Sequence, residues 1–475
     1  MEVARKILFS IFVLVYAVLC PFIILYSFGY IYQPEKKDIS QTGLIYLSSF
    51  PSGASVYLEK SRFKNKTPAT ISELKPGQYQ LGLRLKSYRP WSHQVTIEPG
   101  KASVFKNVPL LPVKFNEITL LPGGRYTSLA MVRGTDYFVV QEGSRLKEFY
   151  IYDRREKEIK PLVGAKAEYS DFAVNSIFTE NKSELLIVYG GPLWNKKYLL
   201  FNLADINTPP SDITGLFKAY PYALRWSADS TKDVFAVYEG FINRFDIKNY
   251  SIYPKYFDGI KGFGLSNRWL YLLGADNVII KSTPDKKQEI ILFEDEHLGR
   301  DLFKWSRFYE IKEIYRDALV FWGDRGDLIV SLPPYRIFDK NVSGMEYNES
   351  KNRVVFWTKN NIWVADFNML NTEYALFNDR LQISSAYRQG SSISQCLWAY
   401  NGAHILFKDK NDVYLLALNS DGRHHKEHIV SVKDNTDVFY AEDENSLYYL
   451  DQGANLTKIQ LFPKEKAVPL AEESQ

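Results

Sequence analysis

Cysteine is nearly absent from this chain of 475 residues, which contains only Cys20 and Cys396. Cys20 lies in a long apolar segment and Cys396 far downstream, so we expect no intramolecular disulfide, and stability must come from burial. A strong charge of either sign is also missing. The net charge is +4 at pH 7, and the basic residues are spread evenly, which argues against a nucleic-acid partner.

Charged side chains are absent from Ile7 to Tyr32. At about 1.5 Å per residue, a helix of this length extends about 39 Å, more than the roughly 30 Å hydrocarbon core of a bilayer. We therefore predict a transmembrane signal anchor at residues 7–32, preceded by a cytoplasmic tail at 1–6. A cleaved signal peptide is the alternative, but its apolar region is usually about 7 to 15 residues long.

The orientation of this anchor rests on the sizes of the flanking parts. Arg5 and Lys6 precede the apolar segment, and Lys36 and Lys37 follow it, so the count of basic residues is a tie. A short tail before a large remainder is the usual form of a signal anchor. We expect a single-pass protein of the cell membrane, in contact with lipid through residues 7–32 and with its C-terminal bulk outside the cytoplasm.

A compact β module is predicted at residues 43–112, after a polar linker at 33–42. Between Tyr79 and Lys86, leucines alternate with polar residues and glycine, a period of two that indicates a half-buried strand. Pro76–Gly77 and Pro99–Gly100 supply turns on either side.

These turns carry a family resemblance. The motifs, in chain order, are Pro51-Ser52-Gly53-Ala54, Val56-Tyr57-Leu58, Thr67-Pro68, Leu74, Pro76-Gly77, Tyr79, Tyr88, Pro90-Trp91 and Val95. Together they resemble the PEGA domain, and the resemblance implies a small β-sandwich of prokaryotic envelope proteins that serves as a binding or spacer unit. Glu59-Lys60 and Ser87 depart from the family pattern, which usually has Asp-Gly and glycine there. Trp91 could stack on a sugar ring or pack over the edge of the sandwich.

From about residue 115 onward, a strand–turn–strand unit recurs. The turn after the first strand of each copy is marked by an aspartate or asparagine: Asp136, Asn181, Asp229, Asn267, Asp317, Asn348, Asn401 and Asp443. These markers are on average about 44 residues apart, within the roughly 40 to 50 residue period of propeller blades. The pattern predicts an all-β fold with a β-propeller of seven or eight blades at residues 115–465 and a C-terminal tail at 466–475.

Two copies of this unit resemble the WD40-like repeats of TolB-type propellers. Trp226, Ser227 and Asp229 match part of the Trp-Ser-Pro-Asp-Gly turn of that family, as do Trp398 and Asn401-Gly402. The resemblance implies a platform for a protein or a polymer. We also expect the strand Glu117 to Leu121 to pair near Lys458 to Phe462 and close the ring.

The sequence contains a cluster of histidines and an adhesion-like tripeptide. His424 and His428 would share one face of a strand about 13 Å apart, too far for one metal ion, and His425 would lie between them. Arg325-Gly326-Asp327 lies between two apolar strands and is interpreted as a tight hairpin.

Other motif-like spacings also have simpler interpretations. Gly259, Gly262 and Gly264 lack the setting of a phosphate loop and are interpreted as turn glycines. Ser61 with Lys64, and Ser144 with Lys147, have the spacing of a nucleophile and a base but no companion motif. We therefore assign no catalytic, cofactor-binding or metal-binding residue, and predict no cofactor.

The sequence favours a non-enzymatic, membrane-anchored binding or scaffold protein of the prokaryotic cell envelope. Its propeller would dock an envelope protein or a cell-wall polymer. The alternatives are a propeller hydrolase that acts on envelope glycans or peptides, and the sensing domain of a partner signalling protein. Clustered carboxylates in a deep pocket would favour the hydrolase, whereas an aromatic or polar face would favour docking.

Overall fold

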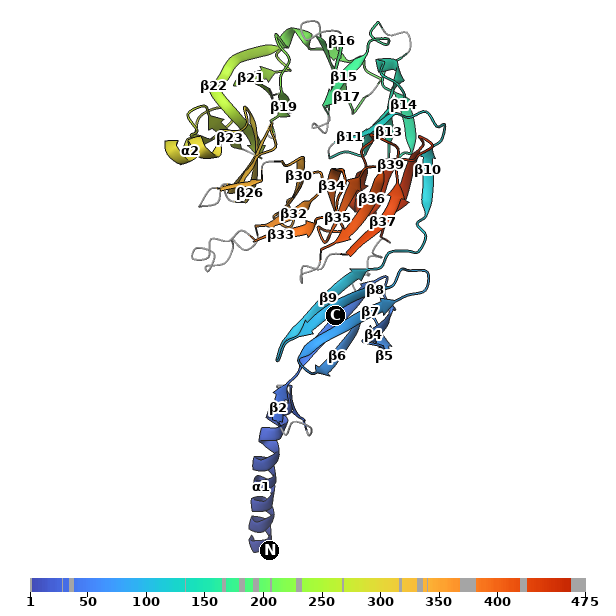
Figure 1. The fold of residues 1–475 in the computed structure, drawn as a ribbon, viewed down its shortest axis with the longest axis vertical. Helices are drawn as coiled ribbons and strands as arrows, with labels where there is room; N and C mark the ends of the chain where they lie inside the picture. The colour runs from blue at the N-terminus through green and yellow to red at the C-terminus, as the bar shows by residue number, and fades with distance from the viewer. Residues whose placement is uncertain are drawn as a thin grey trace. The chain divides into compact units, whose positions relative to one another are not determined.

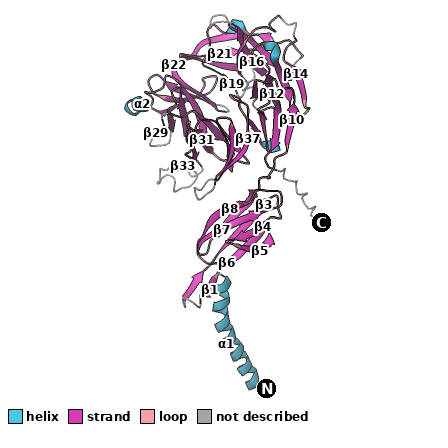
Figure 2. Cartoon of the chain, turned by 45° about the vertical axis from the view of Figure 1, so that its right-hand side comes forward, coloured by secondary structure: helices cyan, strands magenta, loops and turns pink. Residues whose placement is uncertain are grey.

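The computed structural model contains two compact units. The small unit comprises residues 1–117, 444–446 and 459–475, and the large unit comprises residues 118–443 and 447–458. The structure describes the chain apart from the following residues: 1, 28, 34–37, 133, 165–167, 179–183, 191–195, 206, 228–232, 267–268, 316–317, 331–335, 340, 368–381, 419–424 and 463–475. Strands dominate the described parts (Figure 2), which confirms the all-β prediction.

Helix α1 (Glu2–Ser27) opens the chain and contains Pro21. A two-stranded antiparallel hairpin follows, formed by β1 (Tyr30–Gln33) and β2 (Asp38–Gln41). The side chains of Phe9 and Phe12 in α1 are each 69% exposed. Over the residues that the structure describes, no helix combines the length and apolarity required to cross a membrane.

The next elements of the small unit form two facing sheets. The three-stranded sheet has the order β6-β3-β9, and the four-stranded sheet has the order β5-β4-β7-β8. Their bounds are β3 Gly43–Phe50, β4 Ser55–Leu58, β5 Ser61–Lys66, β6 Ala69–Leu74, β7 Gly77–Arg84, β8 Trp91–Ile97 and β9 Ala102–Pro109. Leu81 and Leu83 are fully buried in the common core, whereas Gln80 and Arg84 are exposed. The alternation predicted for this strand is confirmed.

At each of the two departures from the PEGA pattern, one non-glycine residue has a positive φ. Glu59 has φ 55° and Ser87 has φ 69°, both in the left-handed region that glycine occupies without steric cost. Ser87 therefore adopts a conformation that suits glycine, whereas Lys60, at the other usual glycine position, has no positive φ. Trp91 packs against the core, with its ring centroid 5.7 Å from that of His93 and 6.0 Å from that of Phe105. This contact agrees with the packing interpretation of Trp91.

The large unit is a succession of antiparallel sheets, which follow one another in Figure 1 from cyan to red. The first sheet contains β11 Ser128–Met131, β12 Tyr137–Gln141, β13 Phe149–Asp153 and β14 Glu158–Pro161. The second sheet contains β15 Val174–Phe178, β16 Glu184–Gly190, β17 Lys196–Asn202 and β18 Ser211–Asp212.

Strands β19 to β29 form one connected sheet. Their bounds are β19 Ala223–Trp226, β20 Asp233–Tyr238, β21 Gly240–Asp246, β22 Ser251–Ser266, β23 Trp269–Gly274, β24 Ile279–Ser282, β25 Glu289–Phe293, β26 Tyr309–Tyr315, β27 Ala318–Gly323, β28 Leu328–Val330 and β29 Arg336–Asp339. Helix α2 (Glu296–Leu302) lies between β25 and β26.

Three more sheets complete the large unit. The first of them contains β30 Gly344–Asn348, β31 Arg353–Trp357, β32 Ile362–Asp366 and β33 Gln382–Tyr387. The second contains β34 Ile393–Ala399, β35 His404–Asp409, β36 Asp412–Ala417 and β37 His425–Ser431. The last contains β38 Phe439–Ala441, β39 Ser446–Leu450 and β40 Leu456–Gln460, together with β10 Glu117–Leu121.

The long strand β22 serves two groups of strands. Its first part, Ser251 to Ile260, pairs with β21, and its second part, Ile260 to Ser266, pairs with β23. The connected sheet therefore consists of three groups of four strands: two groups share β22, and the third, β26 to β29, is joined to them by the pairing of β26 with β22. The large unit has eight groups in all among the described residues. Of the four sequence markers that the structure describes, Asp136, Asn401 and Asp443 fall between the first and second strands of a group, and Asn348 is the last residue of a first strand, β30. Asn181, Asp229, Asn267 and Asp317 lie outside the described residues.

The glycines of β22 correct one interpretation made from the sequence. Gly259 has φ +67° and supports a bend, but Gly262 and Gly264 lie inside the strand, where β22 pairs in parallel with β26. A Cβ atom on Gly264 would lie 2.1 Å from the carbonyl oxygen of Ile311. The strands approach too closely for any side chain, so these two residues are close-approach glycines rather than turn glycines.

Buried clusters join each group to the next. Six clusters each join two consecutive groups, from the first and second groups to the sixth and seventh. A further cluster packs the eighth group onto the first. That last cluster contains Leu121 of β10, Val140 of β12 and Leu450 of β39. Gln395 of the seventh group exchanges two hydrogen bonds with the backbone of Val438, next to the eighth. The order of the groups is therefore circular.

Strand β10 pairs with β40, as the sequence predicted, and in Figure 1 the cyan β10 lies beside the red strands of the chain's end. Arg154 connects the same two groups. Its guanidinium donates to both carboxylate oxygens of Asp443, at 2.9 and 3.0 Å, and its Nε donates to Asp136 at 3.1 Å. Burial opposes the charge of Arg154, but the two carboxylates outweigh it and raise the pKa of the guanidinium.

Candidate functional site

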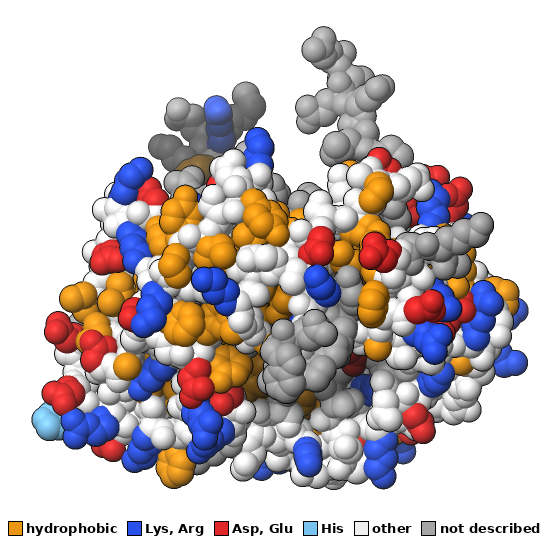
Figure 3. Space-filling view, turned by 90° about the horizontal axis from the view of Figure 1, so that it is seen from above, with side chains coloured by type: hydrophobic (Ala, Val, Ile, Leu, Met, Phe, Trp, Pro, Cys, Tyr) orange, Lys and Arg blue, Asp and Glu red, His pale blue; other side chains and the backbone are white. Residues whose placement is uncertain are grey.

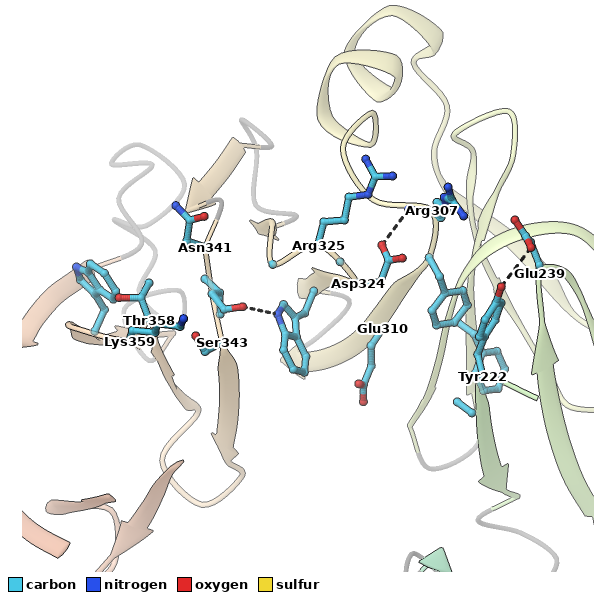
Figure 4. A pocket seen from close by; sticks show the side chains of 18 of the residues that line it. Tyr222, Glu239, Arg307, Glu310, Asp324, Arg325, Asn341, Ser343, Thr358 and Lys359 are labelled. Atoms are coloured by element: carbon cyan, nitrogen blue, oxygen red, sulfur yellow. Dashed lines mark hydrogen bonds between the residues drawn. The ribbon is translucent and has the colours of Figure 1, made fainter. Parts of the chain in front are cut away.

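The large unit contains a cavity of about 1420 Å³. It lies where turns of the third, fifth and sixth groups of strands converge, and Phe263 of β22 adds a residue of the fourth group, so it draws on residues far apart in the sequence (Figure 4). Its aromatic lining consists of Tyr222, Phe263, Phe308, Trp322 and Trp363, and its charged lining consists of Arg225, Glu239, Arg307, Glu310, Asp324, Arg325 and Lys359. We call it the main cavity.

One wall of the main cavity combines an aromatic pair with a carboxylate. The Oη atom of Tyr222, just before β19, donates to Glu239 at 3.2 Å, as Figure 4 shows. The ring centroids of Tyr222 and Phe308 are 6.5 Å apart. The Tyr222 side chain is 59% exposed, and desolvation together with the bond to Glu239 raises its pKa. This wall offers an apolar surface with a polar edge.

Two inner strands contribute an ion pair. Arg225 lies in β19 and Glu310 in β26, and the Nη2 atom of Arg225 donates to Glu310 Oε1 at 3.0 Å. Both side chains are partly exposed. Because Glu310 already has a cationic partner, the pair contributes little net charge to the main cavity.

The hairpin between β27 and β28 contains the adhesion-like tripeptide. Asp327 is 1% exposed, and its carboxylate accepts hydrogen bonds from the hydroxyl of Ser306 and, at 2.6 Å, from the hydroxyl of Tyr309. Burial, and then the bond to Asp327, raise the pKa of Tyr309. Gly326 has φ +86°. The aspartate is therefore a structural residue of a tight hairpin, as the sequence indicated, and only Arg325 projects from it.

The position of Trp322 is fixed by a hydrogen bond from its Nε1 to the carbonyl oxygen of Val342, at 3.2 Å. Opposite, the turn between β31 and β32 is held by Thr358, whose Oγ1 accepts from the backbone N–H groups of Asn360 and Asn361. Lys359 is exposed on that turn. The main cavity is thus built on short, hydrogen-bonded turns between rigid strands.

A smaller cavity of about 460 Å³ lies near the turns between first and second strands of the sixth, seventh and eighth groups, with Met131 added from the first. Trp398, Phe439 and Tyr440 line it together with Glu346 and Glu442. Burial raises the pKa of Glu442, whose carboxylate accepts from the backbone N–H of Asn401. Asn401 and Asn348, both markers of the sequence repeat, are also part of this lining.

The histidine cluster is only partly described. His424 lies outside the described residues, and His425 is the first residue of β37. His428 lies 3.2 Å from Asp412 through its Nε2 atom. Among the described residues there is no group of three histidine, cysteine or acidic side chains placed to hold a metal ion.

The serine–lysine pairs differ in their setting. Ser61 and Lys64 lie in β5, a mostly exposed strand, rather than in the loop that the sequence suggested. Lys147 forms an ion pair with Asp171 at 2.5 Å. The sequence alone did not identify the lining of the main cavity, because its residues come from several separate groups of strands. Of the motifs noted in the sequence, the adhesion-like tripeptide contributes to this lining, through Arg325.

Charges are mixed on the molecular surface. Figure 3 shows basic and acidic side chains interspersed on the face seen from above, with hydrophobic side chains scattered between them. No broad region of one sign is visible on this face, in agreement with the small net charge. Any charge-based recognition must therefore be local.

The fold and the sites define an all-β protein with a cavity-bearing large unit. Residues 42–108 match the PEGA domain family, so the small unit contains a PEGA domain, as predicted. Comparison with curated proteins found no match.

Three solved structures that are similar to the chain have low sequence identity to it. The computationally designed Ika8 protein is 11% identical, with a TM-score of 0.44, over 72% of this chain and 98% of the other. The β-propeller domain of Cps50 (Swd1) from Myceliophteria thermophila is 12% identical, with a TM-score of 0.41, over 73% and 100%. PorZ, a surface component of the type-IX secretion system of Porphyromonas gingivalis, is 12% identical, with a TM-score of 0.38, over 70% and 42%.

Proposed function

We propose that this chain is a non-enzymatic, membrane-anchored binding or scaffold protein of the prokaryotic cell envelope. In this proposal the large unit is an eight-bladed β-propeller that docks an envelope protein or a cell-wall polymer, and the PEGA domain lies between it and the anchor in the sequence. The circular order of the eight strand groups supports the propeller, because such an order protects nearly all strand edges.

The main cavity is the observation that carries the docking role. Its volume of about 1420 Å³ exceeds the roughly 300 to 1,000 Å³ of pockets for small molecules. Its carboxylates are already engaged: Glu239 by Tyr222, Glu310 by Arg225, and Asp324 by the backbone N–H of Arg307, at 3.0 Å. A wide aromatic cavity with engaged acids favours binding over general acid–base hydrolysis.

Photo-crosslinking tests the docking role. The photoreactive residue p-benzoylphenylalanine would replace Phe308, which lines the main cavity, and separately Ile290, an exposed residue of β25 outside that lining. In cells that produce the full chain, irradiation is expected to give a discrete adduct from position 308 only. Equal adducts from both positions, or none from position 308, would contradict a docking role for this cavity.

The membrane location is proposed from the uncharged segment Ile7–Tyr32 and from the exposed apolar side chains of α1, such as Phe9 and Phe12. Protease added to intact spheroplasts should then digest the large unit while cytoplasmic markers survive. Full protection of the large unit until the cells are lysed would reverse the proposed topology.

A further inference from the structure

The cationic side chains of the main cavity fall into two kinds. Arg225 is paired with Glu310. By contrast, Arg307, Arg325 and Lys359 line the same cavity, are exposed, and form no side-chain ion pair with any residue that the structure describes. Figure 4 shows Arg307 and Arg325 on either side of Asp324. The result is a local pair of guanidinium groups without anionic partners.

Guanidinium groups recognise carboxylates through two parallel hydrogen bonds, in a geometry that lysine cannot reproduce. The two arginines are displayed by short elements: Arg325 by the β27–β28 hairpin, and Arg307 by the segment before β26. The backbone N–H of Arg325 donates to Ser306 Oγ at 3.1 Å, and that of Arg307 donates to Asp324. Their backbones are therefore fixed, and little ordering is needed when a ligand binds.

The rest of the lining argues for a peptide rather than a polyanion. Four cationic and three anionic side chains line the cavity, an excess of only one positive charge. A polymer with a phosphate on every repeat would meet Glu239 and Glu310 as well as the arginines. A peptide can place acidic side chains at the arginines and apolar side chains against the aromatic wall of Tyr222 and Phe308.

We propose that the main cavity binds an extended acidic peptide segment of a partner protein, with carboxylates of that segment seated on Arg307 and Arg325. This inference rests on the proposed docking function and names the chemistry of the ligand. The size of the cavity fits several residues of extended chain.

The test uses the full-length chain in detergent and a fluorescein-labelled decapeptide of alternating Glu and Tyr. A decapeptide of alternating Lys and Tyr serves as the comparison, and unlabelled poly(glycerol phosphate) as the competitor. Fluorescence anisotropy is expected to show binding of the acidic peptide, weakening as salt is added. The double variant Arg307→Gln, Arg325→Gln should lose about tenfold or more in affinity, because two charge-assisted contacts are removed.

A matched double variant, Arg62→Gln with Arg300→Gln, removes two arginines outside the cavity and should bind as the unmodified chain does. Equal binding of the basic peptide, or unchanged affinity in the Arg307 and Arg325 variant, would overturn the proposal. Preferential binding of poly(glycerol phosphate) would overturn the peptide assignment alone. If no peptide binds but position 308 still yields an adduct, the ligand class is wrong while docking stands.

Discussion

The small and large units are both all-β, yet their folds are encoded differently. The PEGA domain has one core between two sheets, and its sequence motifs lie mainly in turns. The large unit has a succession of clusters, each between neighbouring groups of strands, and its repeat motifs are degenerate. Each group needs only an apolar face against its neighbour, and many apolar side chains of suitable size can form such a face. Turn motifs therefore identify the small unit, whereas periodicity identifies the large one.

Equivalent core truncations test whether the two units are stabilised separately. Leu83→Ala in the PEGA domain and Leu406→Ala in β35 each remove a buried side chain, at an expected cost of about 2 to 5 kcal/mol. Each substitution should lower the unfolding transition of its own unit and leave the other unchanged in differential scanning calorimetry. A single transition that moves equally with both substitutions would show that the units unfold as one.

Acid should weaken the large unit selectively through His404. Burial lowers the pKa of this histidine to about 4, whereas its ordinary value is near 6.5. Below about pH 6.5 the unfolded chain takes up a proton that the folded chain refuses, so stability is full above that pH and falls as the pH drops toward 4. The loss is expected to reach about 3 kcal/mol.

Denaturant unfolding at pH 7 and pH 4.5 measures this loss. In the variant His404→Phe, the difference between the two pH values should shrink for the large unit, whatever the overall change in stability. An unchanged pH dependence in that variant would show that His404 is not responsible.

Arg154 tests the junction between the first and eighth groups. Arg154→Gln removes the contacts to Asp136 and Asp443, and should destabilise the large unit by about 2 kcal/mol, because the arginine is largely buried. Arg300→Gln removes an exposed helical pair with Glu296 and should cost less than about 0.5 kcal/mol. Equal effects on the midpoint of urea unfolding would contradict a closing role for Arg154.

Ser87 gives the smallest expected effect, and in the opposite direction. Its φ of 69° is costly for a residue with a side chain, so Ser87→Gly should stabilise the PEGA domain by about 1 kcal/mol. The same substitution at Ser92, a residue of β8 with no positive φ, should destabilise it. Stabilisation at both positions would mean that backbone strain is not the cause.

Structural features that repeat along the chain, or that depend on turn residues, could be predicted from the sequence. The period of about 44 residues predicted a strand group at each marker, and the apolar strand Glu117–Leu121 predicted the closing pair with β40. The sharing of β22 was not predictable, because a long strand with internal glycines looks like two strands and a turn. Gly262 and Gly264 were noticed but misinterpreted, since only the parallel neighbour β26 shows why they lack side chains.

The main cavity could not be predicted from the sequence, because its residues share no local pattern. Tyr222, Arg307 and Lys359 are distant in sequence and share no motif. They converge only because three groups of strands lie near one another. A contact that depends on the packing of whole groups leaves no local pattern in a single sequence.

Amide hydrogen exchange on the full-length chain, followed by mass spectrometry, tests the circular order of the large unit most directly. Peptides covering β10 (Glu117–Leu121) and β40 (Leu456–Gln460) come from the two ends of this order. Their amides are expected to exchange as slowly as those of β35 (His404–Asp409), because β10 and β40 pair with each other. Exchange of both strands as fast as in exposed turns, with β35 still protected, would show that the ring is open.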